Sequence, residues 1–528
     1  MRLHLVRLIT TITASAILCA LLSDHVNAAT PNATIHIPSS RPAFAEKLSQ
    51  GLIGFSIEMD RWTSWAGDAV GKPNPFVNQV LGVMESFTGV PPPFRVGADS
   101  EDRGYIQPGI TVINASFPAA TADIPFPEAE ITGIGKDFYA LSSNLPKGTS
   151  FIWGVNLKAR NMSETVAQVA LLADTFQGSR KALMANVTLT SLEIGNEPDF
   201  FTFPGWTPSA YVELWSTIVN KITSIIKLGG PNEPKLEGPA FAGFAAAQWD
   251  AMSVLNAGFA EGKAGKLLGT FGEHHYSGVH AYPSFNPEPK MGDLFNKNSI
   301  RSNLTKHAKE VSRARSVGLP YILGETNSYA NHGAPGVSNT AEAAIWMVDN
   351  ALQAASIGVQ QMYFHHGVGF RYNLFQPVSG AEDGVGLTSR PHILPVFYGV
   401  LAVNEAIGSS GKSCVAEIGT DSATVSAYGI YEQTKLARIV VINSEMYLPS
   451  QNSTRANSTV YLDGLGKDVH FTAKRLSIPF TNATTGLTWA SVNYDTASGV
   501  PEGKPQQEDV TGSAMTVAAS EVVLLCLK

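Results

Sequence analysis

Charged residues are few in this sequence, and positive charge is not in excess. Asp, Glu, Lys and Arg together make up 15% of the 528 residues, and the net charge is −7. Proteins that bind nucleic acid neutralise phosphates with clustered Lys and Arg, so the composition argues against a nucleic-acid partner. Hydrophobic residues make up 44%, which is typical of a globular protein.

Long apolar runs are also lacking after the first 28 residues. No later segment reaches the roughly 20 apolar residues that a membrane-spanning helix needs, so we expect no membrane association. Arg2 and Arg7 precede the apolar run 8–22. Val26 and Ala28 are small residues at the −3 and −1 positions of a cleavage site. This pattern predicts a signal peptide over residues 1–28 and a secreted, extracellular protein, with a signal anchor as the alternative.

Cysteine is scarce, with three residues in the whole chain. Cys19 lies in the predicted signal peptide, which leaves Cys414 and Cys526 for the mature protein. In an oxidising compartment a Cys414–Cys526 disulfide is the simplest hypothesis, and two buried free thiols are the alternative. Export also agrees with eight N-x-S/T sequons, which predict glycosylation at Asn32, Asn114, Asn161, Asn186, Asn303, Asn452, Asn457 and Asn482.

The middle of the chain alternates short apolar runs with longer helical patterns. Near-continuous apolar runs are typical of parallel strands buried on both faces. Eight such strands are predicted, at 51–60, 93–99, 150–157, 189–197, 236–242, 268–276, 319–326 and 361–366. Helices are predicted between them, among them 208–227 with Thr207 as N-cap, and 340–356 with an Asn339/Glu342 capping box.

Eight βα units predict an α/β fold of the (β/α)8 TIM-barrel type. The alternative, an open doubly wound sheet, lacks a glycine-rich phosphate loop after the first strand. After about residue 409, short alternating runs predict a C-terminal antiparallel β-sandwich. We therefore expect four parts: a signal peptide at 1–28, an N-terminal segment at 29–50 that joins the sandwich, a catalytic barrel at 51–409 and the sandwich at 410–528.

Two of the predicted strands end in a glutamate. Glu197 follows the fourth strand in LTSLEIGNEP, and Glu325 ends the seventh in LPYILGETN. Catalytic groups of a (β/α)8 barrel lie at the carboxyl ends of its strands. A pair of carboxylates is what glycoside hydrolysis needs, one as acid/base and one as nucleophile. A second NEP tripeptide, at 232–234, lies in a polar Gly/Pro loop and is interpreted as a turn.

These segments resemble those of retaining barrel glycosidases, and most closely glycoside hydrolase family 79, which includes β-glucuronidases and heparanase. The segments that carry the resemblance are FRVGADSED at 94–102, LEIGNEPDFF at 192–201, EHHYSG at 273–278, LGETNS at 323–328, GAPGVSNTAEAAIWMVD at 333–349 and HHGVGFRYNLFQP at 365–377. They span most of the predicted barrel.

The resemblance implies a role for each matching residue. Glu197 would be the acid/base and Glu325 the nucleophile. Asn196 would bind the sugar 2-OH, and Tyr276 would donate to the nucleophile. Glu58 and Asp99 would bind sugar hydroxyls, although family members more often carry an amide or a hydroxyl at the position of Asp99.

The family binds the carboxylate of glucuronic acid with backbone N–H groups and tyrosines after strands seven and eight. In this sequence Ala330 stands at the position of the first tyrosine, with Tyr329 one place before it, and Tyr372 matches the second. The resemblance therefore implies substrate binding by Tyr329, Asn331, His332, Gly333 and Tyr372, with His365 close by. Neither H-E-x-x-H nor a Cys/His zinc spacing is present, so no metal and no cofactor is expected.

The sequence therefore predicts a secreted, retaining exo-β-glucuronidase. Its substrate would be a glycan ending in β-linked glucuronic acid or 4-O-methylglucuronic acid, without an obligate protein partner. Three alternatives stay open: a neutral-sugar β-glycosidase of the same clan, a heparanase-like endo-β-glucuronidase and an inactive glycan-binding barrel. The endo-enzyme is disfavoured because the chain lacks the dense basic clusters that a sulfated polymer would need.

Overall fold

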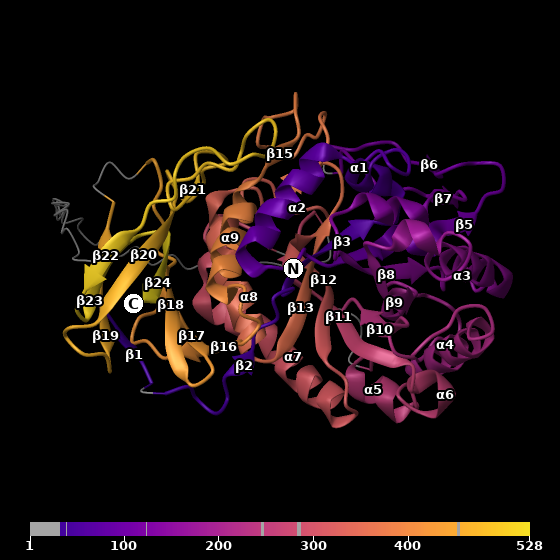
Figure 1. The fold of residues 1–528 in the computed structure, drawn as a ribbon, viewed down its shortest axis with the longest axis horizontal. Helices are drawn as coiled ribbons and strands as arrows, with labels where there is room; N and C mark the ends of the chain where they lie inside the picture. Colours follow the sequence, from indigo (N-terminus) through magenta and orange to yellow (C-terminus); the bar gives the residue numbers. More distant parts are fainter. Residues whose placement is uncertain (1–31, 39, 123, 244–247, 282–286, 451–454) are drawn as a thin grey trace, which may run out of the picture.

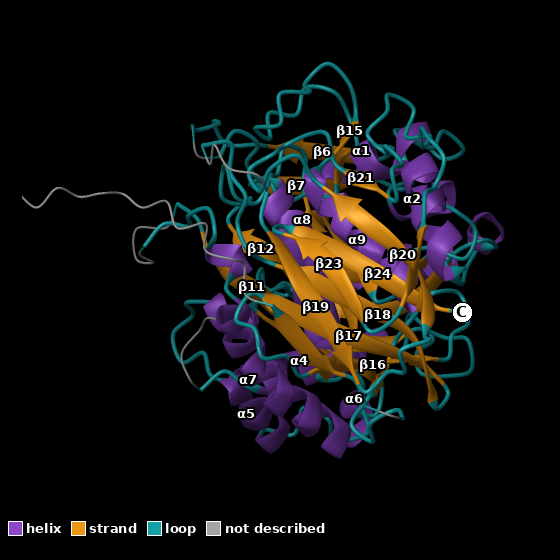
Figure 2. Cartoon of the chain, turned by 90° about the vertical axis from the view of Figure 1, so that its left-hand side faces the viewer, coloured by secondary structure: helices purple, strands orange, loops and turns teal. Residues whose placement is uncertain are grey.

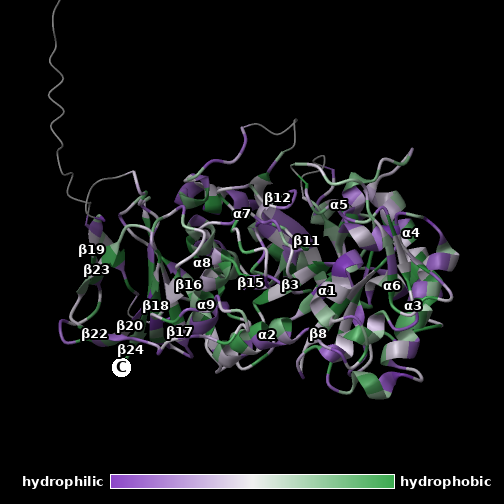
Figure 3. Cartoon of the chain, turned by 90° about the horizontal axis from the view of Figure 1, so that it is seen from above, coloured by the Kyte–Doolittle hydropathy of each residue, from purple (hydrophilic) through white to green (hydrophobic). Residues whose placement is uncertain are grey.

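A computed structural model describes residues 32–38, 40–122, 124–243, 248–281, 287–450 and 455–528. Two bodies lie along the long axis of the molecule, a closed barrel and a set of antiparallel sheets (Figure 1). Seen from above, the sheets occupy one end and helices α3 (Met162–Phe176), α4 (Pro208–Ile222) and α6 (Gly262–Gly265) the other (Figure 3). The predicted signal peptide and Asn452 lie outside the described residues.

The barrel consists of eight parallel strands in sequence order, and it confirms the predicted fold class. Its strands are β3 (Ile53–Glu58), β4 (Phe94–Gly97), β8 (Ser150–Val155), β9 (Thr188–Ile194), β10 (Lys235–Phe241), β11 (Leu268–Val279), β12 (Tyr321–Ala330) and β13 (Val359–His366). β13 pairs with β3 and closes the ring. Each of the eight predicted strands overlaps one of these.

Helices cover the outside of the barrel, and their starts follow local sequence rules. α4 begins at Pro208, and the side chain of Thr207 accepts from Ala210 N, as predicted; the helix ends at Ile222 rather than at 227. The other helices are α1 (Trp62–Ala66), α2 (Pro75–Thr88), α5 (Ala251–Asn256), α7 (Lys297–Ser316), α8 (Ala341–Ser356) and α9 (Pro395–Ile407).

The capping box predicted for α8 is wrong. Thr340 is the N-cap and makes no side-chain cap bond. The Glu342 carboxylate accepts instead from the backbone N–H groups of Gly292 and Leu294, and Asn339 Nδ2 donates to Asp383 O. Tertiary partners therefore replaced the local contact that the spacing suggested.

An additional small sheet follows β4 and was not predicted. It is formed by β5 (Gly104–Ile106), β6 (Ile113–Ser116) and β7 (Ile131–Ile134). Its connection between β6 and β7 carries Glu128 to the mouth of the barrel, where this residue lines a cavity together with Glu197 and Glu325. A second small pair, β14 (Phe375–Gln376) and β15 (His392–Ile393), follows β13.

The C-terminal sheets form a sandwich. The larger sheet contains β2 (Glu46–Lys47), β16 (Ser413–Ile418), β17 (Val425–Glu432), β18 (Lys435–Asn443), β20 (His470–Ser477), β21 (Thr488–Trp489), β22 (Glu508–Thr511) and β24 (Glu521–Leu527). The smaller contains β1 (Ala33–His36), β19 (Asn457–Asp463) and β23 (Ala514–Ala518). β19 and β23 lie outermost in Figure 1 and face the viewer in Figure 2.

Each face of the larger sheet has its own core. One face packs on the smaller sheet through residues such as Val441, Val460 and Val517. The opposite face shares the barrel's core, where Tyr428, Val440 and Leu524 are buried with side chains of α8 and α9. The sandwich is thus joined to the barrel by apolar contact, and no described helix is long and apolar enough to cross a bilayer.

The predicted Cys414–Cys526 disulfide is wrong, since both cysteines are free. Cys414 lies on β16 and Cys526 on β24, with β17 and β18 between them. Three strand spacings put their backbones about 14 Å apart, whereas bridged cysteines need Cα atoms within about 7 Å. Of the sequons, Asn32, Asn114, Asn161, Asn186, Asn457 and Asn482 are exposed and Asn303 is half-buried, with Nδ2 donating to Ser277 O.

Candidate active site

A cavity of about 530 Å³ opens at the carboxyl ends of the barrel strands. This is the end at which (β/α)8 enzymes place their catalytic groups. The predicted residues among its lining are Glu58, Asp99, Asn196, Glu197, Tyr276, Glu325, Asn331, His332, His365 and Tyr372. Lining residues that were not predicted are Asp102, Glu128, Lys158, Phe200, Phe201, Val279 and Ala330.

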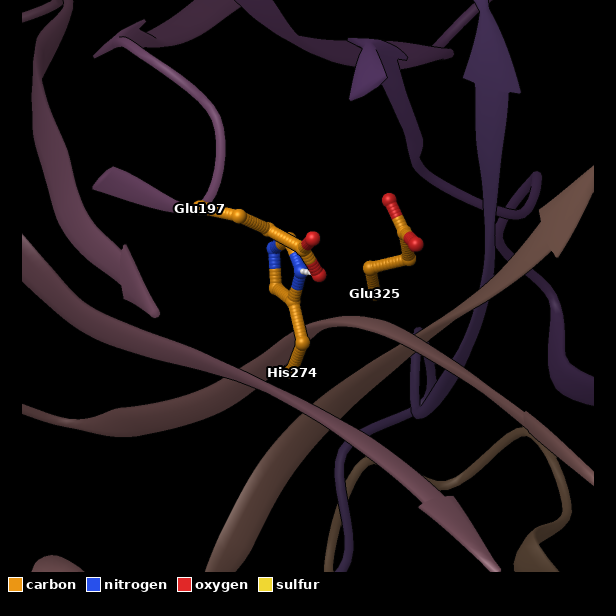
Figure 4. Close-up of side chains that lie close together, drawn as sticks. All are labelled: Glu197, His274 and Glu325. Atoms are coloured by element: carbon orange, nitrogen blue, oxygen red, sulfur yellow. Dashed lines mark hydrogen bonds and ion pairs between the residues drawn. The ribbon is translucent and has the colours of Figure 1, made fainter. Parts of the chain in front are cut away.

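Glu197 and Glu325 approach each other across this cavity (Figure 4). A carboxylate oxygen of each, together with a ring nitrogen of His274, lies within 4.8 Å of the others. Glu325 belongs to β12, and Glu197 follows β9 in a left-handed conformation with φ 46°, its N–H bonded to Ala240 O at 3.0 Å. A non-glycine residue holds this backbone only where its surroundings require it, as functional sites often do.

The surroundings of Glu325 stabilise an anion. Tyr276 Oη donates to its Oε1 at 2.7 Å, and Arg95 Nη1 donates to its Oε2 at 2.7 Å. Burial alone would raise the pKa of Glu325, but the charges of His365 and Arg95 outweigh it and hold the pKa well below its usual range. Glu325 is therefore ionised and aligned, as a nucleophile must be.

The surroundings of Glu197 favour the neutral acid. Burial raises the pKa of Glu197 well above its usual range, and the negative charge of Glu325 raises it further. Nδ1 of His274 lies 2.9 Å from Glu197 Oε1. Two carboxyls with pKa values driven apart are what acid and nucleophile roles require.

Glu197, His274 and Glu325 are close enough together to be considered as a metal site. Both oxygens of Glu325, however, already accept charge-assisted or hydroxyl hydrogen bonds from Arg95 and Tyr276. A guanidinium on the carboxylate would repel a cation at the same oxygen. The donor set therefore fits a carboxylate pair better than a metal centre.

Arg95 links several parts of the site and was overlooked in the sequence. Its side chain is fully buried and donates to Glu193 Oε1 from Nε at 3.0 Å and from Nη2 at 2.5 Å. It also donates to Ser56 Oγ at 2.9 Å and to Asn196 Oδ1 at 2.7 Å. The signal was available, because an arginine in the apolar run PFRVG must find buried acceptors.

Asn196 and Asp99 are connected to each other. Asn196 Nδ2 donates to Asp99 Oδ1 at 3.0 Å, and Asn196 N donates to Asp102 Oδ2 at 3.2 Å. Its carbonyl oxygen accepts from Arg95, so the amide is held in one orientation at the cavity wall.

Glu58 and His365 form a second pair beside Glu325. His365 Nε2 lies 3.3 Å from Glu58 Oε1, and His365 Nδ1 lies 3.6 Å from Glu325 Oε2. Burial would lower the pKa of His365, but the charge of Glu325 and the bond to Glu58 raise it to about 9. His365 is thus an imidazolium at neutral pH.

The loop after Glu325 is only partly as predicted. Asn331 and His332 line the cavity, but Tyr329 and Gly333 do not. Tyr329 faces a separate cavity with Asn303 and Trp346. The prediction that Tyr329 binds the substrate is therefore wrong. β12 continues to Ala330 and carries the Tyr329 ring away from the cavity that contains Glu197 and Glu325.

His332 has partners that the sequence did not indicate. Its Nε2 lies 2.6 Å from Glu128 Oε1, and its ring stacks on Phe370 with centroids 3.7 Å apart. Although burial opposes it, the hydrogen bond with His332 lowers the pKa of Glu128. Gly333 meets Tyr372 and Ser338, both 3.0 Å from where a Cβ would stand, so it packs behind the loop.

Comparison with known proteins agrees with this geometry. A sequence profile for the "Glycosyl hydrolase family 79 C-terminal beta domain" matches residues 427–524. β-Glucuronidases of Neurospora crassa and Aspergillus niger are 28% and 29% identical to this chain. Those alignments cover 87% and 89% of this chain and 87% and 88% of the two relatives. These similarities support an assignment to glycoside hydrolase family 79.

Solved structures show the same fold. A 4-O-α-L-rhamnosyl-β-D-glucuronidase from Fusarium oxysporum superposes with a TM-score of 0.76 at 23% identity, over 94% of this chain and all of that one. A family 51 α-L-arabinofuranosidase from Bifidobacterium longum gives 0.60 at 15% identity, with the same coverage. The protein described here is thus a glycoside hydrolase with a barrel and a C-terminal β domain.

Proposed function

We propose that this protein is a secreted, retaining exo-β-glucuronidase of glycoside hydrolase family 79. It would hydrolyse terminal β-linked glucuronic acid, or its 4-O-methyl form, from glycans. The observation that carries the reaction class is the carboxyl pair, with Glu197 and Glu325 oxygens within 4.8 Å across the cavity. Retaining glycosidases place their two carboxyl groups about 5–5.5 Å apart, and inverting ones leave room for a water between them.

The roles follow from the two environments. Glu325, ionised beside Arg95, attacks the anomeric carbon and forms a glycosyl-enzyme. Glu197, protonated, gives its proton to the leaving oxygen and then acts as base for the incoming water. Asn196, fixed by Arg95 and Asp99, is placed to bond the sugar 2-OH, an interaction that strengthens in the transition state.

Recognition of the substrate carboxylate is supported by the loop at residues 331–333. Asn331, His332 and Gly333 have φ values of 66°, 67° and 84°, so three successive residues turn in the left-handed region. Successive backbone N–H groups in such turns can form concave anion-binding sites. Tyr372, His332 and the imidazolium of His365 line the same cavity and add donors and positive charge.

One observation favours a second candidate, a neutral-sugar β-glycosidase. Six acidic side chains line the cavity, Glu58, Asp99, Asp102, Glu128, Glu197 and Glu325. Lys158 and the imidazolium of His365, which lies beside Glu58, offset part of this negative charge. The names of the two curated relatives favour the glucuronidase.

The test compares three chromogenic substrates that differ at one carbon: the 4-nitrophenyl β-glucuronide, its glucuronamide and the β-glucoside. Hydrolysis of the glucuronide alone supports the proposal, because the amide keeps the shape and removes the charge. Preference for the glucoside would establish the neutral-sugar enzyme. Turnover of none, with Glu325→Gln binding glycans as the wild type does, would indicate a binding protein.

A further inference from the structure

Three fully buried glutamates lie beneath the catalytic pair inside the barrel. Glu193 is on β9, Glu237 on β10 and Glu101 on the short helix η2 (Ala98–Arg103), and the exposed fraction of each is 0%. None of them lines the catalytic cavity. Burying several negative charges together costs free energy unless they are neutralised. Some of these carboxyl groups must therefore be protonated or paired with a cation.

Hydrogen bonding decides which of the three carry protons. Glu193 Oε1 accepts two bonds from Arg95. Among the described residues, no N–H or hydroxyl group donates to Glu193 Oε2 or to either oxygen of Glu101 and Glu237. Glu193 is within hydrogen-bond reach of both other carboxyls. An ionised carboxylate only accepts, whereas a protonated one donates, so protons on Glu101 and Glu237 satisfy both contacts.

Glycines make the space for these carboxyl groups. A Cβ at Gly97 or Gly154 would overlap Glu101 Oε2, and a Cβ at Gly272 would overlap Glu237 Oε1. Gly324, next to the nucleophile, would place a Cβ 3.6 Å from Glu237 Oε1 and 3.9 Å from Glu193 Oε2. The neighbouring strands β4, β8 and β11 therefore leave room for polar groups where a packed barrel would hold apolar ones.

The charges around the cluster also favour protons on Glu101 and Glu237. Burial and the negative charge of Glu193 raise the pKa values of both Glu101 and Glu237 well above their usual range. Burial also acts on Glu193, but Arg95 outweighs it and lowers the Glu193 pKa. The negative charge of Asp102, whose own pKa is raised by burial to about 6, raises the pKa of Glu101 further. The remaining titratable groups that face the cluster are Tyr139, Tyr211 and Tyr363, whose pKa values are raised, and His274, whose pKa is lowered to about 4. These three tyrosines and His274 are neutral at pH 7. Arg95 is therefore the cation that balances the negative charge of Glu193.

We propose that Glu101 and Glu237 are neutral acids that donate to an ionised Glu193, and that Glu193 thereby anchors Arg95 against Glu325 and Asn196. Glu193 is a positioning residue, since it reaches the nucleophile only through the guanidinium. Loss of one donor raises the pKa of Glu193. Once Glu193 is protonated, the Nε and Nη2 side of Arg95 loses its charged partner, and the alignment of Glu325 and Asn196 is lost with it.

The test uses matched pairs of variants at the two donor positions, assayed on the chromogenic glucuronide, and in that choice of substrate it rests on the proposed function. Glu237→Gln keeps a donor of the same shape, whereas Glu237→Met removes it at similar volume. We expect kcat of Glu237→Gln within about twofold of wild type at every pH. Glu237→Met should move the acid limb of kcat up by about one pH unit, which is a loss of about tenfold on that limb. Glu101→Gln and Glu101→Met should behave in the same way.

Two results would overturn the proposal. Equal losses in the Gln and Met variants would mean that the carboxyls act as ions or as shape alone, and a wild-type pH profile in the Met variants would mean that Glu193 needs no donors. Thermal unfolding of each variant separates loss of fold from loss of alignment. Difference infrared spectra provide a readout that needs no substrate, because Glu237→Gln should remove a protonated-carboxyl C=O band. If wild type hydrolyses no glucuronide, the proposed function fails, while the infrared result still decides where the protons lie.

Discussion

Nδ1 of His274 lies 2.9 Å from Oε1 of Glu197, while Nε2 of the same ring is buried without a partner among the described residues. Burial lowers the pKa of His274 to about 4, so the ring is neutral at the pH of most assays. The tautomer that leaves no orphan donor carries its hydrogen on Nδ1 and donates it to Glu197. The acidic proton of Glu197 then belongs on its other oxygen, free for the leaving group.

This arrangement predicts that His274 matters most when the leaving group needs a proton. His274→Leu removes the donor, and His274→Asn restores an N–H near the position of Nδ1. For a poor leaving group such as an alkyl aglycone we expect kcat of His274→Leu to fall about tenfold to a hundredfold, and that of His274→Asn to fall less. With a dinitrophenyl aglycone both variants should approach wild type; equal losses on both substrates would contradict the assignment.

The two catalytic glutamates should respond differently to azide. Glu325→Ala removes the nucleophile, so turnover is expected only with azide, which attacks the exposed face and gives the α-glycosyl azide. Glu197→Ala keeps the nucleophile and should spare substrates with good leaving groups, with azide giving the β-product. Product stereochemistry from NMR measures the outcome, and exchanged products would reverse the two roles.

Phe200 is placed to contact the aglycone. It follows the acid by three residues, lines the catalytic cavity and is 50% exposed, which is unusual for a large apolar side chain on a cavity wall. In the proposed mechanism Glu197 protonates the leaving oxygen, which places the aglycone on this side. Phe200→Ala should lower kcat/KM about fivefold for an aryl glucuronide and leave a methyl glucuronide unchanged. Equal effects on the two substrates would exclude this contact.

Stability should fall as pH rises from about 6.5 to 8. Burial raises the pKa values of Asp60 and Glu273 to about 8, whereas in the unfolded chain both are ionised above about pH 5. The folded state then binds more protons, so the free energy of unfolding decreases with rising pH across this window. In Asp60→Asn the free energy of unfolding, measured by chemical unfolding, should decrease by about 1–2 kcal/mol less between pH 6.5 and pH 8 than in wild type. A slope identical to wild type would contradict a protonated Asp60.

The free cysteines give a direct chemical test of the sandwich register. Cys414 and Cys526 are separated by two strands, so the denatured, unreduced mature protein should titrate as two thiols per chain. A result of no thiols would mean a different strand order in the larger sheet. A double Cys→Ser variant with an unchanged unfolding midpoint would agree with the absence of a bridge.

The barrel was predictable because its strands are buried on both faces. Such strands are nearly continuous apolar runs in the sequence. The position of Glu197 and Glu325 at the cavity was predictable because an acid at the end of such a run needs a polar site. By contrast, Glu128 comes from a loop between β6 and β7, far in sequence from every barrel strand end. His274 lay inside the matched segment EHHYSG, but spacing alone does not tell which histidine faces the acid.

Two wrong predictions have a common cause. The Asn339/Glu342 capping box and the Cys414–Cys526 disulfide were both inferred from residues that could satisfy each other. In the structure Asn339 and Glu342 bond to other partners, and the two cysteines lie on strands that are not neighbours. Tertiary packing decides which of several chemically possible contacts forms. Glu101, Glu193 and Glu237 illustrate the same limit, since only the fold brings them to one place.

The pairing of β1 with β19, and of β2 with β16, has a consequence for how the chain is made. β1 and β2 precede the barrel in the chain, and their partner strands are synthesised after the whole barrel. Until then β1 and β2 have unpaired edges, and the barrel lacks the sheet that covers α8 and α9. Contacts of such long sequence separation form slowly. A chain that stops before β16 would therefore expose an apolar helix face, which makes the C-terminal sheets a requirement for release of a soluble enzyme and not an accessory to it.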